Sequence, residues 1–188
     1  VADRIRIVTD KGQNLRLNPE TGLVEAADAA LNNNAINGIA YTNSVPGAES
    51  TILYDIDFDA KVLYRQDPPN NGTLVKVGDL QNDLGTNVSF DISADNKNAI
   101  AIGKSATQAN LYTINLATGL SELVGRFASS LNIQGIAMPV NPVAYAVSEN
   151  NFVIIDLKTS KRVNKPITGL QTGETILGID MRPANGQI

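Results

Sequence analysis

The sequence predicts an all-β protein, a β-propeller of four-stranded blades with four blades present and about one missing from the ring. Two observations carry this prediction: one phrase of strands and turns recurs four times, and its copies are evenly spaced. The first strands begin near residues 3, 51, 99 and 143, so successive copies lie 48, 48 and 44 residues apart. A period of about 40–50 residues with about four strands per unit is typical of propeller blades.

The predicted strands are rich in valine, isoleucine, tyrosine and threonine, which suit a pleated, half-buried surface. The first strands span residues 4–9, 52–57, 99–103 and 144–148. The second strands begin at Leu15, Leu63, Leu111 and Phe152. The third strands span residues 23–26, 74–77, 122–125 and 163–168. The fourth strands span residues 37–42, 88–92, 134–138 and 177–181, and turn signals rich in Asn, Asp, Pro and Gly separate the strands.

These strands define the expected domain organisation. Residues 1–188 form a single propeller domain or most of one. The blades are expected at about residues 3–43, 51–93, 99–139 and 143–183. Residues 184–188 then read as the start of a further blade.

Composition narrows the classes of function. Apolar residues make up 43% of the chain and charged residues 18%, so the chain can bury a core. The net charge of −4 opposes non-specific nucleic-acid binding, which needs a basic surface. No apolar run is long enough to cross a membrane as a helix. Because the sequence has no Cys and no His, a Ser-His-Asp triad, a thiolate site and a typical zinc centre are excluded.

Several long phrases resemble one family, a bacterial group of uncharacterised, mostly exported domains known only as a domain of unknown function. The phrases are DRIRIVTD at residues 3–10, GQNLRLNP at 12–19, AYTN at 40–43, TILYDID at 51–57, PPNNGTL at 68–74 and GETILGIDMRPANGQ at 173–187. The resemblance implies a propeller-like repeat domain outside the cytoplasm, at the cell surface or secreted. It implies no catalytic residue.

The resemblance also shows a shifted order. In the family, the part similar to residues 151–187 opens the domain, and the part similar to residues 3–18 comes later, with one more blade between them. Either the chain is a piece of a tandem array, or residues are skipped in its numbering. We therefore expect the ring to be completed by further copies or by a missing segment of the same protein.

Three arginines form the main candidate binding group. Arg4 and Arg6 alternate with isoleucines, so both guanidinium groups leave the same face of one strand, and Arg16 follows on the next strand. With Asn14, they are candidates for a pocket that binds an anion or a carboxylate ligand. The alternative is that they are buried and paired with acidic residues within the protein, because buried charges are normally paired.

Calcium is the one cofactor that the sequence leaves open. Asp55, Asp57 and Asp59 place carboxylates at alternate positions, as in the start of a calcium loop. However, Ala60 stands where that loop needs glycine and Gln66 where it needs a bidentate glutamate. The alternative interpretation is a set of structural acids at a strand end and its turn.

The leading functional hypothesis is a non-enzymatic extracellular scaffold, binding or adhesion module. Such a module would also suit a place in a tandem or polymeric assembly. The hypothesis rests on the repeats, the lack of His and Cys, and the lack of a convergent catalytic set in the sequence. The alternative is a propeller hydrolase or lyase that depends on carboxylates and calcium. That alternative rests on analogy with other propellers alone.

Overall fold

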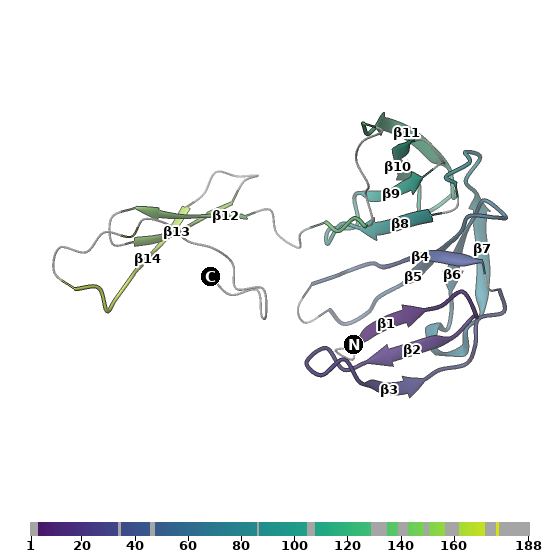
Figure 1. Ribbon diagram of the computed structural model, residues 1–188, viewed down its shortest axis with the longest axis horizontal. Coiled ribbons are helices and arrows are strands. Elements are labelled where there is room, and N and C mark those ends of the chain that lie inside the picture. Colours follow the sequence, from purple (N-terminus) through teal and green to yellow (C-terminus); the bar gives the residue numbers. More distant parts are fainter. Residues whose placement is uncertain are drawn as a thin grey trace. The chain divides into compact units, whose positions relative to one another are not determined.

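The structure is a computed structural model, and its description covers residues 4–33, 35–45, 48–85, 87–104, 108–128, 135–138, 143–148, 151–156, 162–171 and 176. The chain forms two compact units, residues 1–140 and residues 141–188. The described residues confirm the predicted all-β class, because every sheet is antiparallel and the one helical element is a single 3-10 turn (Figure 1). No helix in the described part is long and apolar enough to cross a membrane.

The first unit contains three sheets. Sheet 1 has the order β1-β2-β3, with β1 at Ile5–Val8, β2 at Asn14–Leu17 and β3 at Val24–Ala27. Sheet 2 has the order β4-β5-β6-β7, with strands at Ile36–Tyr41, Leu53–Asp57, Val62–Gln66 and Leu74–Asp79, and the 3-10 turn η1 at Pro69–Asn71. Sheet 3 has the order β8-β9-β10-β11, with strands at Asn87–Ile92, Ala99–Lys104, Ala109–Ile114 and Ser121–Arg126.

The second unit contains sheet 4, with the order β12-β13-β14 and strands at Val143–Ser148, Asn151–Asp156 and Arg162–Pro166. The first, second and third strands predicted from the sequence overlap these elements in all four sheets. The predicted strand at 177–181 lies outside the described residues, and so does the expected blade start at 184–188. Closure of the four sheets into a propeller stays a prediction.

The structure differs from the sequence prediction in which strand begins each sheet. The strands predicted to end the first two units, at 37–42 and 88–92, instead pair with the strands that follow them, as β4 with β5 and β8 with β9. The repeated phrase fixes the order of the strands but not which neighbour each one pairs with, because loops of similar length lie on both sides of β4 and β8. The first strand is therefore β4 in sheet 2 and β8 in sheet 3, and these two strands lie alongside each other (Figure 1).

The hydrophobic core lies between sheets 2 and 3. Ile56 and Leu63 of sheet 2 are fully buried and belong to one cluster with Phe90, Ile92 and Ala101 of sheet 3. Alternation along each strand sends these side chains to the same face. Sheets 2 and 3 thus pack face to face on apolar side chains, and sheet 1 covers the other face of sheet 2 through polar groups, described below.

Backbone contact at the edge of this core requires glycine. A Cβ atom added at Gly78 in β7 would lie 1.9 Å from the carbonyl oxygen of Thr118, in the turn between β10 and β11. Gly119 in the same turn has a φ of +82° and lies against Gly78. The two sheets approach here more closely than any side chain permits.

This close approach generates a stability prediction with an internal control. Substitution Gly78→Ala is expected to lower the free energy of unfolding by about 1–3 kcal/mol, because backbone atoms must move to admit the methyl group. Gly125→Ala, at a strand position with no atom within 4 Å of the added Cβ, should stay within about 0.5 kcal/mol. Urea unfolding of both variants checks the prediction, and equal effects would contradict it.

Candidate functional site

The candidate site is a polar seam between sheets 1 and 2, made of Arg6, Asn14, Arg16, Asp28, Tyr41, Asp55 and Asn70. Strand alternation places its cationic part, because Arg6 on β1 and Arg16 on β2 are directly opposed and share one face of sheet 1. Tyr41 and Asp55 belong to sheet 2, while Asp28 and Asn70 come from the linker after β3 and from η1. The seam therefore joins six segments of the chain: β1, β2, the linker after β3, β4, β5 and η1.

Arg6 is the centre of the seam, and its side chain is only 4% exposed. Its Nε donates to the Tyr41 hydroxyl at 2.6 Å, and one Nη2 proton goes to the Asn70 side-chain oxygen at 2.7 Å. Its Nη1 donates to Asp28 at 3.1 Å and also to the side-chain oxygen of Asn14. The guanidinium group is thus paired within the protein, as expected for a buried cation.

Asp28 accepts hydrogen bonds from both arginines of the seam. Arg16 forms a bidentate pair with it, Nε to Oδ2 at 2.8 Å and Nη2 to Oδ1 at 2.8 Å. The Arg16 hydrogen bonds, and then the charge of Arg16 and contact with Arg6, lower the pKa of Asp28 against the opposing effect of burial. The bond to Asp28 likewise raises the pKa of Arg16. Two cations sharing one buried carboxylate leave the seam with positive charge.

The Asn14 side chain bonds the seam to the backbone of two neighbouring loops. It is 1% exposed, and its side-chain amide donates to the carbonyl oxygens of Ala29 at 3.2 Å and Pro69 at 2.9 Å. The backbone N–H of Ala29 in turn donates to the carbonyl of Asn70 at 3.0 Å. The linker after β3 is therefore held against the turn before β7.

Arg4 does not belong to the seam. Its side chain is 36% exposed and forms an ion pair with Glu25. The sequence prediction placed it with Arg6 and Arg16 because all three lie on one face. The structure brings together Arg6, Asn14 and Arg16 and leaves Arg4 at the margin of the sheet.

Asp55 is a buried carboxyl group on the sheet 2 side of the seam. The residue is fully buried, and neither carboxyl oxygen accepts a hydrogen bond from the described residues. Burial raises the pKa of Asp55 to about 7, and the charge of Arg6 opposes that rise. Burial is the larger effect because no donor compensates the lost hydration. Asp55 therefore holds a proton in a pH range where other aspartates are ionised.

The other two calcium candidates do not converge on Asp55. Asp57 accepts hydrogen bonds from the side chain of Asn33 and from the N–H of Ala60, the latter at 2.8 Å. Asp59 lies in the turn after β5 and is exposed. In the described ranges, no three acidic side chains are grouped so that they could hold a metal ion. Asp57 thus acts as a structural acid at its turn.

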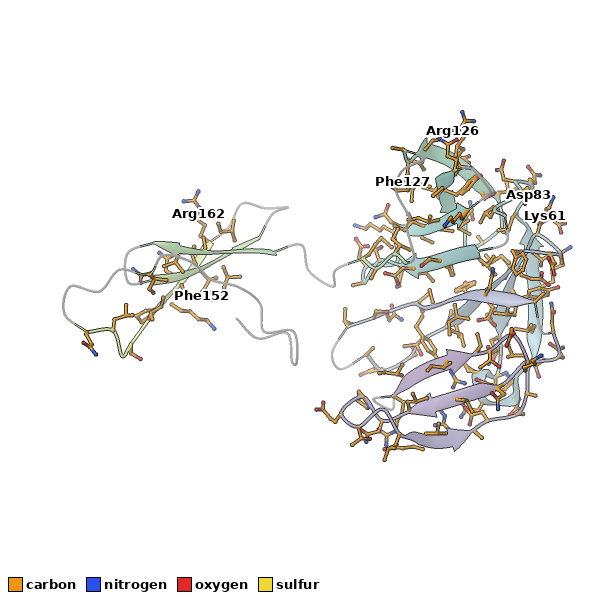
Figure 2. All side chains as sticks on the ribbon, viewed as in Figure 1. Lys61, Asp83, Arg126, Phe127, Phe152 and Arg162 are labelled. Atoms are coloured by element: carbon orange, nitrogen blue, oxygen red, sulfur yellow. The ribbon has the colours of Figure 1, made fainter. Side chains whose placement is uncertain are left out.

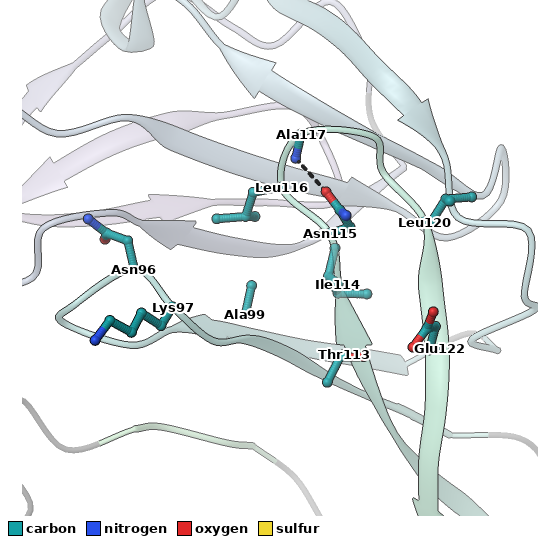
Figure 3. A pocket seen from close by; sticks show the side chains of 10 residues that line it. All are labelled: Asn96, Lys97, Ala99, Thr113, Ile114, Asn115, Leu116, Ala117, Leu120 and Glu122. Carbon is teal, nitrogen blue, oxygen red and sulfur yellow. Dashed lines mark hydrogen bonds between the residues drawn. The ribbon is translucent and has the colours of Figure 1, made fainter.

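A hollow lies away from the seam, on sheet 3. It has a volume of about 490 Å³ and is lined by residues of the β8–β9 turn and of β10, β11 and their connecting turn (Figure 3). Its charged lining residues are Lys97 and Glu122, and Lys97 also lies 3.7 Å from Asp95. The side chain of Asn115 accepts a hydrogen bond from the N–H of Ala117 within this turn. The hollow is an open, mixed surface.

The seam differs from the ion pairs on the outside of sheets 2 and 3. Lys61 and Asp83 form an ion pair at 3.1 Å with side chains 45% and 68% exposed (Figure 2). Exposed pairs of this kind contribute about 0–1 kcal/mol. The side chains of Arg6 and Asp28 are only 4% and 7% exposed, so removing one partner of this pair affects a buried charge rather than a solvated one.

Sequence reasoning missed Asp28, Tyr41 and Asn70. Asp28 carries a detectable signal, because it is the one acid in the small-residue run that follows Glu25. Tyr41 and Asn70 carry none, because they meet Arg6 only through the packing of sheet 1 on sheet 2. These three residues turn an arginine cluster into a paired network.

Comparison with known proteins confirms the family resemblance. The family model described as "Domain of unknown function (DUF4394)" matches residues 1–137. No curated protein matches the chain. Among solved structures, hydrazine synthase of Kuenenia stuttgartiensis is similar with a TM-score of 0.40 and 14% identity, over 83% of this chain and 43% of that chain. The chain thus spans less than half of that structure's length, and a likeness this weak assigns no activity.

The seam predicts a difference between two arginines on one strand face. Arg6→Met should lower the free energy of unfolding by about 1–3 kcal/mol, because it leaves three neutral acceptors without their donor while Asp28 keeps only Arg16. Arg4→Met removes an exposed pair and should cost less than about 1 kcal/mol. Chemical denaturation measures both values. Similar losses would contradict the seam as described.

Asp55 predicts a pH dependence of stability. The unfolded chain loses the Asp55 proton near its ordinary pKa of 3.8, whereas the folded protein keeps it up to about pH 7. The folded state then binds more protons than the unfolded state, so stability falls as pH rises from about 4 to 7 and levels off above.

Asp55→Asn should abolish this slope. The free energy of unfolding of the variant, relative to that of the parent, should rise by about 2–3 kcal/mol between pH 5 and pH 8. Urea midpoints at the two pH values measure the gain. Asp28 acts in the opposite sense, since its lowered pKa makes its contribution disappear only in more acidic solution. Parallel pH profiles of variant and parent would show that Asp55 is ionised in the folded protein.

Proposed function

This chain belongs to the DUF4394 family, and we propose that it is a non-enzymatic extracellular module built on a β-propeller, whose role is binding and assembly with further copies. The observation that carries the proposal is an uncovered apolar face on sheet 1. The other features of the chain are consistent with it: the seam is paired internally, and the repeated sheets offer surfaces that stack on one another.

The 48-residue repeat allows the exposure of this face to be compared with that of the equivalent positions in sheets 2 and 3. Leu53 in β5 and Ala101 in β9 occupy the same repeat position as Ile5 in β1, and both are 0% exposed. Ile5 is 48% exposed. In sheets 2 and 3 that position is covered by the preceding sheet, whereas sheet 1 has no described sheet before it.

The rest of this face is apolar as well. Ile7 is 37% exposed, and the strand register places Ile5 opposite Leu17 and Ile7 opposite Leu15. Val24, opposite Leu17 on β3, is 55% exposed. Contiguous apolar patches on soluble proteins usually mark sites of interaction. We infer that another sheet of the same repeat covers this one, because sheets 1, 2 and 3 carry matched faces.

Sedimentation velocity of the full chain over a wide concentration range tests the proposal. The parent should associate as concentration rises, and Ile5→Asp should shift it toward monomer. Val124→Asp provides the matched control, because Val124 is 58% exposed on the outer strand β11 and should leave association unchanged. Circular dichroism and thermal melting show that both variants fold. A parent that stays monomeric at every concentration would overturn the assembly proposal.

A further inference from the structure

Among the described residues, sheet 1 has no strand in the position with which sheets 2 and 3 begin. β5 pairs with β4 on one edge and β6 on the other, and β9 is likewise flanked by β8 and β10. β1 corresponds to β5 and β9 in the repeat, yet it pairs only with β2 among the described strands. Its free edge exposes backbone groups that can accept one more strand.

The face of β4 that lies toward sheet 1 shows the same difference between sheet 1 and sheets 2 and 3. Ile36, Gly38 and Ala40 of β4 are buried, whereas Ile39 and Tyr41 on the opposite face are only partly buried. Ile39 and Tyr41 are opposite Asp55 and Leu53, which face sheet 1. β4 therefore packs beside β8 on one side and keeps a partly exposed face toward β1 on the other.

β8 shows how such a neighbour is held. Residues 135–138 lie against it, where the N–H of Ile136 donates to the Ser89 hydroxyl at 2.9 Å and the N–H of Met138 donates to the Asp91 carboxylate. Ser89 occupies the repeat position of Ala40 in β4, and Asp91 occupies that of Thr42 directly after it. The described residues 135–138 form no strand, unlike the strand predicted at 134–138, but the segment lies beside the first strand of sheet 3.

One segment of the chain carries the first-strand phrase without a described partner. Residues 36–41 read INGIAY, residues 133–138 read IQGIAM and residues 176–181 read ILGIDM. All three share isoleucine, then glycine and isoleucine at the third and fourth positions. Asp180 also occupies the repeat position of Ser89, whose hydroxyl accepts the N–H of Ile136 beside β8. Apart from Ile176, this last segment lies outside the described residues.

We propose that the free edge of β1 binds residues 176–181 of a second copy as the first strand of sheet 1. This inference rests on the proposed function, since it names the segment by which copies assemble. Main-chain hydrogen bonds to β1 give affinity in such strand addition, and alternate side chains set the register. The β4–β5 register predicts Ile179 opposite Ile7 and Met181 opposite Ile5.

Because the chain contains no cysteine, disulfide trapping can test this register on a clean background. Directly opposed residues of antiparallel strands lie close enough for a disulfide. The full chain with both Ile7→Cys and Ile179→Cys should form disulfide-linked dimers and larger oligomers on mild oxidation. The control pairs Ile7→Cys with Asp180→Cys, whose side chain leaves the other face of the same strand. Equal cross-linking of the two pairs would overturn the proposed register.

Mixing the single variants identifies the source of the strand. A mixture of the Ile7→Cys and Ile179→Cys variants should form a disulfide-linked heterodimer. The yield of this heterodimer should exceed the yield of covalent homodimer from either variant alone. If the double variant instead forms only a disulfide within one chain and the mixture gives no heterodimer, a second copy is not the donor. If the parent self-associates in sedimentation but the mixture does not cross-link, assembly stands and this segment is not its contact.

Discussion

The first strand of each sheet is the constraint on which the rest of the structure depends. β4 and β8 each close one edge of their own sheet and lie alongside each other, so a first strand contributes to two sheets at once. The apolar core between sheets 2 and 3 forms because both sheets have their first strand in place. Sheet 1 has no such strand among the described elements, and its exposed isoleucines follow from that difference.

The two interfaces between sheets in the first unit are built from different kinds of contact. Sheets 2 and 3 meet on apolar side chains and on glycines that let backbones touch. Sheets 1 and 2 meet on Arg6, which donates hydrogen bonds to four other segments of the chain. A buried ion pair contributes little net stability but penalises any misaligned partner heavily. The polar seam thus sets the position of sheet 1, whereas the apolar core supplies most of the burial.

Much of the fold was predictable, because alternation and turn residues are local signals. The positions of the first three strands in each repeat follow from them. The pairing of β4 was not predictable in this way, since both connections around it are of loop length and only tertiary burial decides between them. At the site, alternation predicted that Arg6 and Arg16 share a face. It could not show that Asp28 and Asn70 reach them from turns, or that Asp55 would be buried without a donor.

The central claim is that the free edge of β1 is an acceptor of a strand from another copy. Hydrogen–deuterium exchange of the full chain at low and high protein concentration tests this claim most directly. The account predicts that amides of residues 5–8 become protected as concentration rises, while those of residues 53–57 are protected throughout. Fast exchange of residues 5–8 at every concentration would contradict the account, and so would full protection in the most dilute sample.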